Sequence, residues 1–215
     1  MLLKRDTGGN IHMETSKLPL AQHFSNLRAN PKWALKLLIA IVVVVLTTLI
    51  SNSLIDYDTL FKDSGLSGQE LEQTKAIGQI SGVIGGIVAG IIGIGITFVI
   101  FLLISKIMKS DASAKTIFSA TLSFTVITSI IALIVIIIQW IAGLSPTDYV
   151  ITSLNIFDKG NKFLGAFNLQ TLIGAYVFGV MLLATNRFSK KSALIWSIVY
   201  LVIFVGFALI GASFQ

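Results

Sequence analysis

The chain has 215 residues, of which 54% are hydrophobic and 12% are charged, whereas roughly a quarter of the residues are charged in a typical soluble domain. Its mean hydropathy of +0.87 excludes a soluble globular fold and a disordered chain. The chain has no cysteines, and its net charge of +6 comes from basic residues that punctuate apolar runs, so we expect no disulfide, thiolate site or nucleic-acid partner.

Residues 1–33 precede the first long apolar run and are predicted to lie in the cytoplasm. The segment Thr7–Asn10 can be back-translated into a bacterial ribosome-binding sequence that lies a few codons before Met13. One hypothesis is therefore that natural translation starts at Met13 and that residues 1–12 are not native. The alternative is a genuine polar tail.

Residues 14–30 are predicted to form an amphipathic helix, because Leu20, Phe24 and Leu27 share one face at helical spacing. Pro31 favours a break before the first membrane span. We expect this helix to lie along the inner membrane surface, with its basic side toward anionic lipid. The alternative is that it docks on the protein's own cytoplasmic loops.

Five stretches without Asp, Glu, Lys, Arg or His are long enough, or nearly so, to cross a bilayer core, which needs about 20 apolar residues in a helix. Backbone groups in lipid must bond within the segment, so each stretch is predicted to be helical. The predicted fold is all-α: a polytopic integral membrane protein with a bundle of five transmembrane helices and an N-terminal interfacial helix. The membrane domain covers residues 34–212, with spans at 34–54, 77–105, 117–142, 167–186 and 193–212.

The charges of the connecting segments predict how the chain crosses the membrane. Twelve of the 16 basic residues lie in the N-terminal segment or just inside the first span, in the link 106–115 and in the link 187–191. Seven of the 10 acidic residues lie in the two links on the other side. The positive-inside rule therefore predicts a cytoplasmic N-terminus, and five spans then place Gln215 outside. We expect a cell-membrane protein, and the abundance of Ile and Lys points to a bacterial source.

The second span carries a row of glycines at four-residue spacing: Gly78, Gly82, Gly86 and Gly90. Helix association in lipid relies on close packing, and a glycine stripe lets another backbone approach. The row predicts a tight helix contact, either within the chain or between two copies in a homo-oligomer.

The third span carries hydroxyl groups at the same spacing, on Thr121, Thr125 and Ser129. Together with Gln139 and Gln170 they are candidates for lining a polar path. The alternative is structural, because such hydroxyls more often bond to carbonyls of their own helix or to a neighbouring helix.

The charge-free stretches contain no side chain that titrates near neutral pH. Proton-coupled transporters usually need an Asp, Glu or His inside the membrane. The only histidines, His12 and His23, lie in the N-terminal segment without further metal ligands, and HExxH, GxSxG and P-loop motifs are absent. We therefore expect no enzyme, no catalytic residue, no cofactor and no metal.

Three stretches together resemble the Yip family, small polytopic membrane proteins known as Rab/Ypt interactors, with many bacterial relatives. They are the entry to the first span at Asn30–Trp33, the opening of the third span at Ser113–Ser119, and the segment Gly165–Gln170, which is followed by a span and Arg187–Ala193. The resemblance covers about residues 20–212. Two features depart from it: Gln170 replaces a common aromatic residue, and the third span has no proline.

The resemblance implies five spans, a cytoplasmic N-terminus and a bacterial branch of the family. Bacterial relatives look like accessory membrane proteins, some of them encoded near ABC-type exporters. The small-GTPase contacts of eukaryotic relatives do not transfer, and the family supplies no catalytic residues.

The leading hypothesis is a non-enzymatic accessory or adaptor protein of the bilayer. It binds or stabilises a membrane-protein partner, for which an ABC-type exporter is one candidate, or protects against membrane-active peptides. The alternative is a small permease or channel with its polar path on the third and fourth spans. The charge-poor spans disfavour ion-motive coupling but permit passive flux.

Overall fold

The computed structural model describes residues 3–5, 11–13, 17–62 and 64–214. Two short strands, β1 (Leu3–Arg5) and β2 (Ile11–Met13), pair antiparallel near the N-terminus. The sequence pattern did not predict them. The hypothesis that residues 1–12 are not native falls partly on residues 1–2 and 6–10, which lie outside the described residues.

The described chain is otherwise helical, and four of its helices are long and apolar enough to cross a membrane. These helices are α2 (Ala34–Ser53), α4 (Gly68–Ile107), α5 (Ala114–Ile141) and α8 (Lys190–Ser213). The segment predicted as the fourth span forms α7 (Leu169–Ala184), which is apolar but has only 16 residues. The protein is therefore an all-α polytopic membrane protein.

Four shorter elements complete the described fold. The nine-residue α1 (Ala21–Ala29) precedes the bundle. α3 (Tyr57–Leu60) follows α2, while the 3-10 helix η1 (Leu154–Phe157) and α6 (Lys162–Gly165) lie between α5 and α7. The amphipathic helix predicted over 14–30 is thus shorter, because the chain turns at Leu20, whose φ is +68°. Residues 14–16 lie outside the described part of the chain.

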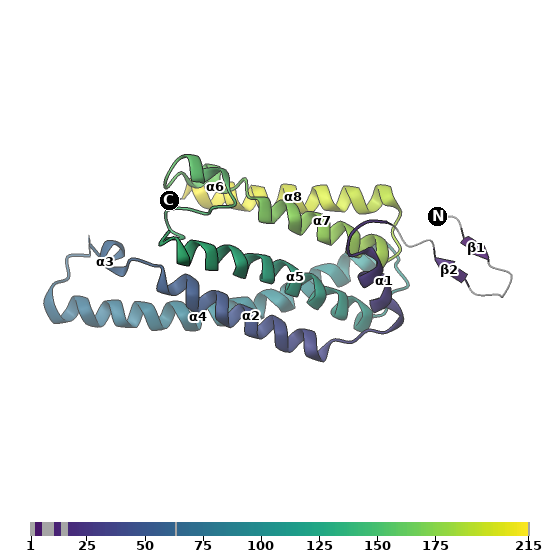
Figure 1. Ribbon diagram of the computed structural model, residues 1–215, viewed down its shortest axis with the longest axis horizontal. Helices are drawn as coiled ribbons and strands as arrows, with labels where there is room; N and C mark the ends of the chain where they lie inside the picture. The colour runs from purple at the N-terminus through teal and green to yellow at the C-terminus, as the bar shows by residue number, and fades with distance from the viewer. Residues whose placement is uncertain (1–2, 6–10, 14–16, 63, 215) are drawn as a thin grey trace.

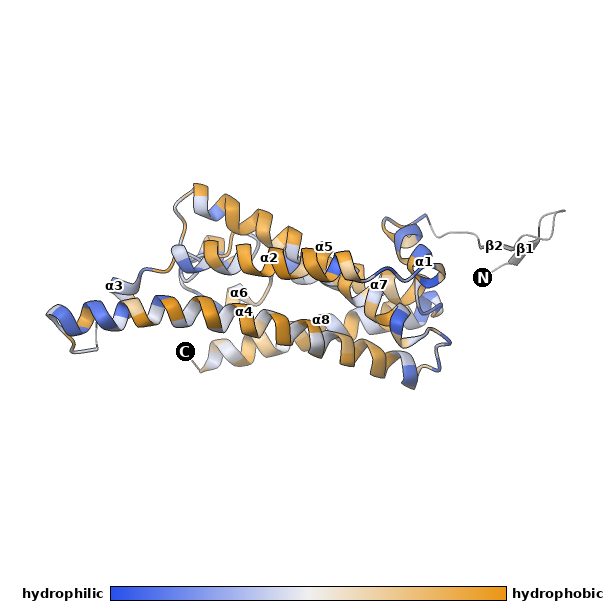
Figure 2. Ribbon diagram, turned by 90° about the horizontal axis from the view of Figure 1, so that it is seen from below, coloured by the Kyte–Doolittle hydropathy of each residue, from blue (hydrophilic) through white to orange (hydrophobic). Residues whose placement is uncertain are grey.

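The apolar helices differ so much in length that they cannot all match the thickness of one bilayer. The 40 residues of α4 span about 60 Å, against about 24 Å for α7 and about 30 Å for a hydrocarbon core. Figure 1 shows the N-terminal turns of α4 and the short α3 extending beyond the rest of the bundle. In Figure 2 these turns are hydrophilic, while apolar residues dominate the middle of the long helices. The start of α4 therefore projects out of the membrane.

Aromatic rings join α4, α5, α7 and α8 in the core. The ring centroid of Phe101 lies 4.8 Å from that of Phe178 in a stacked arrangement and 5.2 Å from that of Phe124 edge to face. Tyr200 of α8 lies 5.4 Å from Phe178. Such offset and edge-to-face pairs are favourable beyond the area they bury. Three rings far apart in sequence therefore fix α4 and α5 against α7.

The glycine row of α4, Gly78, Gly82, Gly86 and Gly90, which we call the packing row, lies against α2 and the segment after it. A Cβ atom placed on Gly90 would lie 2.5 Å from Cγ1 of Val44, and one placed on Gly86 would lie 2.7 Å from Cγ2 of Thr48. Both distances are below van der Waals contact. α2 can therefore lie this close to α4 because these glycines have no side chain.

α7 and α8 approach each other by the same means. A Cβ atom on Gly174 would lie 2.8 Å from the hydroxyl oxygen of Tyr200, and one on Gly179 would collide with the hydroxyl of Ser197. Close contact at small residues is thus how two separate helix pairs of this bundle associate.

Replacing Gly86 with Leu should destabilise the protein by about 1–3 kcal/mol, because the side chain must push Thr48 and α2 away. Gly85→Leu is the matched control, since a Cβ atom at Gly85 has nothing within 4 Å. Leu is also the better helix former, so the control should unfold at the wild-type midpoint or above it. Unfolding of both variants in mild detergent, followed by circular dichroism, measures the difference. Equal midpoints for Gly86→Leu and Gly85→Leu would contradict the packing argument.

Candidate functional site

Charge separates the two ends of the bundle. The end that carries α1, which we call the basic end, has ten cationic side chains and a single carboxylate, that of Asp111, among residues 17–62 and 64–214. The cations are Lys17, Arg28, Lys32, Lys36, Lys106, Lys109, Lys115, Arg187, Lys190 and Lys191. The opposite end has six carboxylates and four lysines within the described chain. In Figure 1, α1 and the last turns of α8 lie at opposite ends.

α1 folds back onto the basic end of the bundle. The Phe24 side chain is fully buried, and Ala21 and Leu27 are also buried, in one cluster with residues of α4, α5, α7 and α8. The apolar face is therefore packed on the protein, as the docking alternative expected, although on the ends of helices instead of on loops. The prediction that α1 lies along the inner membrane surface stays a prediction, while its apolar face contacts the ends of α5 and α7.

Arg28 fixes α1 to two separate turns of the chain. Its guanidinium donates to the carbonyl oxygen of Thr185 at 2.7 Å and pairs with the Asp111 carboxylate at 2.5 Å. The Thr185 hydroxyl in turn donates to the carbonyl of Phe24 at 3.1 Å. The hydrogen bond from Arg28 holds the pKa of Asp111 below its ordinary value, and the charge of Arg187 contributes. Asp111 therefore stays ionised at neutral pH.

Buried hydrogen bonds hold the α4–α5 and α7–α8 turns together. The Asn186 side-chain amide donates to the hydroxyl of Ser105, which donates to the carbonyl of Phe101 at 2.7 Å. The Ser110 hydroxyl donates to the carbonyl of Asn186 at 3.1 Å. The side chains of Ser105 and Asn186 are buried, so breaking this link would leave polar groups without partners. The two turns therefore form one rigid unit.

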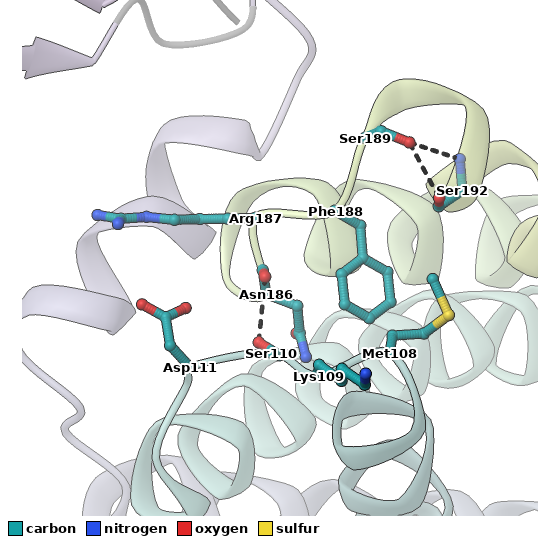
Figure 3. A pocket seen from close by; sticks show the side chains of 9 residues that line it. All are labelled: Met108, Lys109, Ser110, Asp111, Asn186, Arg187, Phe188, Ser189 and Ser192. Carbon is teal, nitrogen blue, oxygen red and sulfur yellow. Dashed lines mark hydrogen bonds between the residues drawn. The ribbon is translucent and has the colours of Figure 1, made fainter.

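A pocket of about 260 Å³ lies between these two turns, and we call it the loop pocket (Figure 3). Its lining residues are Met108, Lys109, Ser110, Asp111, Asn186, Arg187, Phe188, Ser189 and Ser192. Lys109 and Arg187 have φ values of +53° and +57°, a left-handed conformation that is uncommon for residues other than glycine. Each follows the end of an apolar helix and turns the chain toward the next one.

His23 and Lys36 complete the electrostatics of the basic end. Burial lowers the pKa of His23, and the positive charge of Lys36 lowers it further, so the imidazole is neutral at neutral pH. The Lys36 ammonium donates to the hydroxyl of Ser119 at 3.1 Å, and that hydroxyl donates to the carbonyl of Lys32 at 2.7 Å. Lys36 thus lies in the first turn of α2, and its ammonium donates to both the Ser119 hydroxyl and the Lys32 carbonyl.

A second pocket, of about 440 Å³, lies at the opposite end and includes Asp56, Asp58, Glu72 and Lys75. Asp56 caps α3 by accepting from the backbone N–H groups of Asp58 and Thr59. It also accepts from the Thr59 hydroxyl at 2.7 Å, which lowers the pKa of Asp56. Lys75 pairs with Asp58 and with Glu72. These acidic groups are engaged by the chain itself, and no group of three or more metal-ligating side chains occurs among the described residues.

The five residues predicted to line a polar path occupy two separate places. Thr121 is buried, and its hydroxyl donates to the carbonyl of Ile117 in its own helix at 2.9 Å. Thr125 and Ser129 follow it along α5 and are half-buried. The bond of Thr121 to its own helix matches the structural alternative, in which the hydroxyl groups bond to carbonyls and do not line a path.

The two glutamines hold the link between α5 and α7. The Gln139 amide donates to the carbonyl of Tyr149 at 3.0 Å, and its side-chain oxygen accepts from the N–H of Ile151 at 3.5 Å. The Gln170 amide donates to the hydroxyl of Thr152 at 2.9 Å. Neither glutamine lines either of the two pockets described above.

The sequence patterns did not identify the residues that build the basic end. The charges of Arg28, Asp111 and Arg187 contributed to the predicted orientation, and Arg187 also belongs to a segment that resembles the Yip family, but no contact was predicted for these residues or for Ser105 and Asn186. A signal was present, since Asn186 ends an apolar run directly before an arginine. Its partner could not be read, because Ser105 and Asn186 are 81 positions apart.

One comparison with known protein families matches nearly the whole helical bundle. Residues 18–212 match the family model of the Yip1 domain, and this range takes in α1, all the apolar helices and both turns of the loop pocket. No curated protein and no solved structure gives a significant match. Because the match covers most of the chain, the protein belongs to the Yip1-domain family of membrane proteins.

Proposed function

We propose that this protein is a non-enzymatic accessory protein that binds a helix of a membrane-protein partner on the open side of α4. The observation that carries this proposal is a second line of small residues on that helix, which we call the open row. It consists of Ser81, Gly85, Ala89, Gly93 and Thr97, each four positions apart.

Gly85 in the open row lies about 100° around α4 from Gly86 in the packing row. A Cβ atom at Gly85 or at Gly93 would have nothing within 4 Å, in contrast to Gly86 and Gly90. Small residues at this spacing allow two helices in lipid to approach closely. α4 therefore has one such line occupied by α2 and one still available.

The surroundings of the open row suit a partner that is itself embedded in lipid. The neighbouring side chains are apolar and exposed: Ile84, Val88, Ile92 and Ile96. Charged groups are absent from α4 between Lys75 and Lys106, so the row offers no attraction to a soluble acidic or basic surface. A transmembrane helix with small residues of its own fits this surface best.

The resemblance to bacterial accessory proteins supplies the candidate partner, an ABC-type exporter, and the candidate role of protecting against membrane-active peptides. The cell membrane is the proposed location. The separation of ten cations from the acidic end supports a cytoplasmic N-terminus and a C-terminus outside.

A photo-crosslinking amino acid at Ala89 should capture a partner protein in native membranes. The double variant Gly85→Leu/Gly93→Leu should reduce the crosslinked product about ten-fold, since two leucines block close approach. The matched control is Gly206→Leu/Gly211→Leu on α8, where added Cβ atoms also meet nothing within 4 Å. Mass spectrometry of the crosslinked band identifies the partner.

This experiment separates the possible partners. A band that contains a different membrane protein and disappears only in the α4 variant supports the accessory function. A band that contains two copies of this chain shows a homo-oligomer and rejects a foreign partner. Absence of any product at Ala89, with normal membrane insertion, rejects the use of the open row.

Reporter fusions should show that the two termini lie on opposite sides of the membrane. Alkaline phosphatase joined after Gln215 is expected to be active, and a fluorescent protein at the same position dark, because the first folds only outside the cytoplasm and the second inside it. A fluorescent protein before Met1 is the control and should fluoresce. Fluorescence from the C-terminal fusion would disprove the proposed orientation.

A further inference from the structure

We infer that the loop pocket binds the phosphate-bearing headgroup of an anionic lipid. The pocket lies between the turn that follows α4 and the first turn of α8 (Figure 3). Its volume of about 260 Å³ lies below the range of drug-sized ligand sites and suits a small polar group. This inference concerns lipid and does not depend on the proposed protein partner.

The charges around the loop pocket favour an anion. Lys109 and Arg187 line it, and Arg28 lies beside Asp111 at its edge. Asp111 is the only carboxylate in the lining, and its charge is already matched by Arg28. Two positive charges therefore remain for a ligand. Basic pockets at the cytoplasmic ends of transmembrane helices are typical sites for acidic lipid headgroups.

Hydroxyl groups at the start of α8 provide donors to the same pocket. The hydroxyls of Ser189 and Ser192 share one hydrogen bond of 2.9 Å, in which only one of them donates. The other hydroxyl hydrogen is thus free to point at a ligand. These residues also lie at the N-terminal end of α8, where the helix dipole favours negative charge.

The backbone of both cationic residues is held in an unusual conformation. The positive φ values of Lys109 and Arg187 cost energy for residues with a Cβ atom. The buried link between Asn186 and Ser105 fixes the turn that carries Arg187, so the backbone of this turn is in place before any ligand arrives. A binding site formed in advance loses less entropy when it is filled.

The apolar surroundings point to lipid as the source of the phosphate. Phe188 and Met108 line the pocket beside the charged groups, as Figure 3 shows. On the membrane side, Ile107 of α4 is 68% exposed and Leu194 of α8 is 61% exposed. Acyl chains attached to a headgroup in the loop pocket would cover these side chains. A free phosphate would gain no contact with them.

Native mass spectrometry of the full chain in detergent tests this inference. The protein is titrated with dioleoyl phosphatidylglycerol, with dioleoyl phosphatidylcholine and with inorganic phosphate. We expect the phosphatidylglycerol adduct to form at a lower ligand concentration than the adduct of phosphatidylcholine or of inorganic phosphate. The double variant Lys109→Asn/Arg187→Asn should raise the concentration for half-occupancy by on the order of ten-fold. Asn tolerates a positive φ, so both turns are preserved.

The matched control is Lys17→Asn/Lys115→Asn, which removes two charges from the basic end outside the loop pocket. It should bind phosphatidylglycerol like the wild type. An equal loss in the control would show general attraction to a basic surface and overturn the site. Equal retention of phosphatidylcholine would overturn the preference for an anionic headgroup, and equally strong retention of inorganic phosphate would overturn lipid as the source.

Discussion

The arrangement of this bundle depends on the contact between α2 and the packing row of α4. Lipid supplies no hydrophobic force between apolar helices, so the contact must come from close packing. The missing side chain of Gly86 allows Thr48 to approach the α4 backbone, and Gly90 does the same for Val44. Held in this way, α2 also lies along α5, where Lys36 and Ser119 join the two helices. α5 in turn supports α7, and α7 supports α8.

The absence of water within the bilayer also explains where the polar chemistry lies. A polar group in hydrocarbon needs a partner from the protein. Thr121 and Thr97 therefore bond to carbonyl groups one turn earlier in their own helices. Only at the ends can side chains keep charge and remain open to a ligand. The loop pocket and the acidic pocket lie at these two ends.

The sequence was informative where a residue's role is local and uninformative where it is distant. Apolar length predicted the long helices, and Pro31 correctly marked the break before α2. The fourth predicted span, 167–186, extends two residues beyond α7 at each end, because Asn168 caps the start of the helix and Thr185 caps its end. The contact between Arg28 and Thr185 crosses 157 positions and leaves no periodic trace. The sequence likewise did not show which helix the packing row contacts, because that contact joins two different helices.

The open row lies on α4 and the loop pocket begins just after the end of that helix, but the two are energetically separate. Thr97, the last residue of the row, is about 15 Å along α4 from Ile107, where the helix ends before the loop pocket. This separation exceeds both a side-chain contact and the screening length of about 8 Å at physiological salt. Coupling over it would need an element with two discrete arrangements. The Asn186–Ser105 link instead holds the end of α4 in one arrangement. Changes at Gly85 and at Lys109 should therefore act additively, so that a lipid bound at the basic end neither recruits nor excludes a partner helix on the open row.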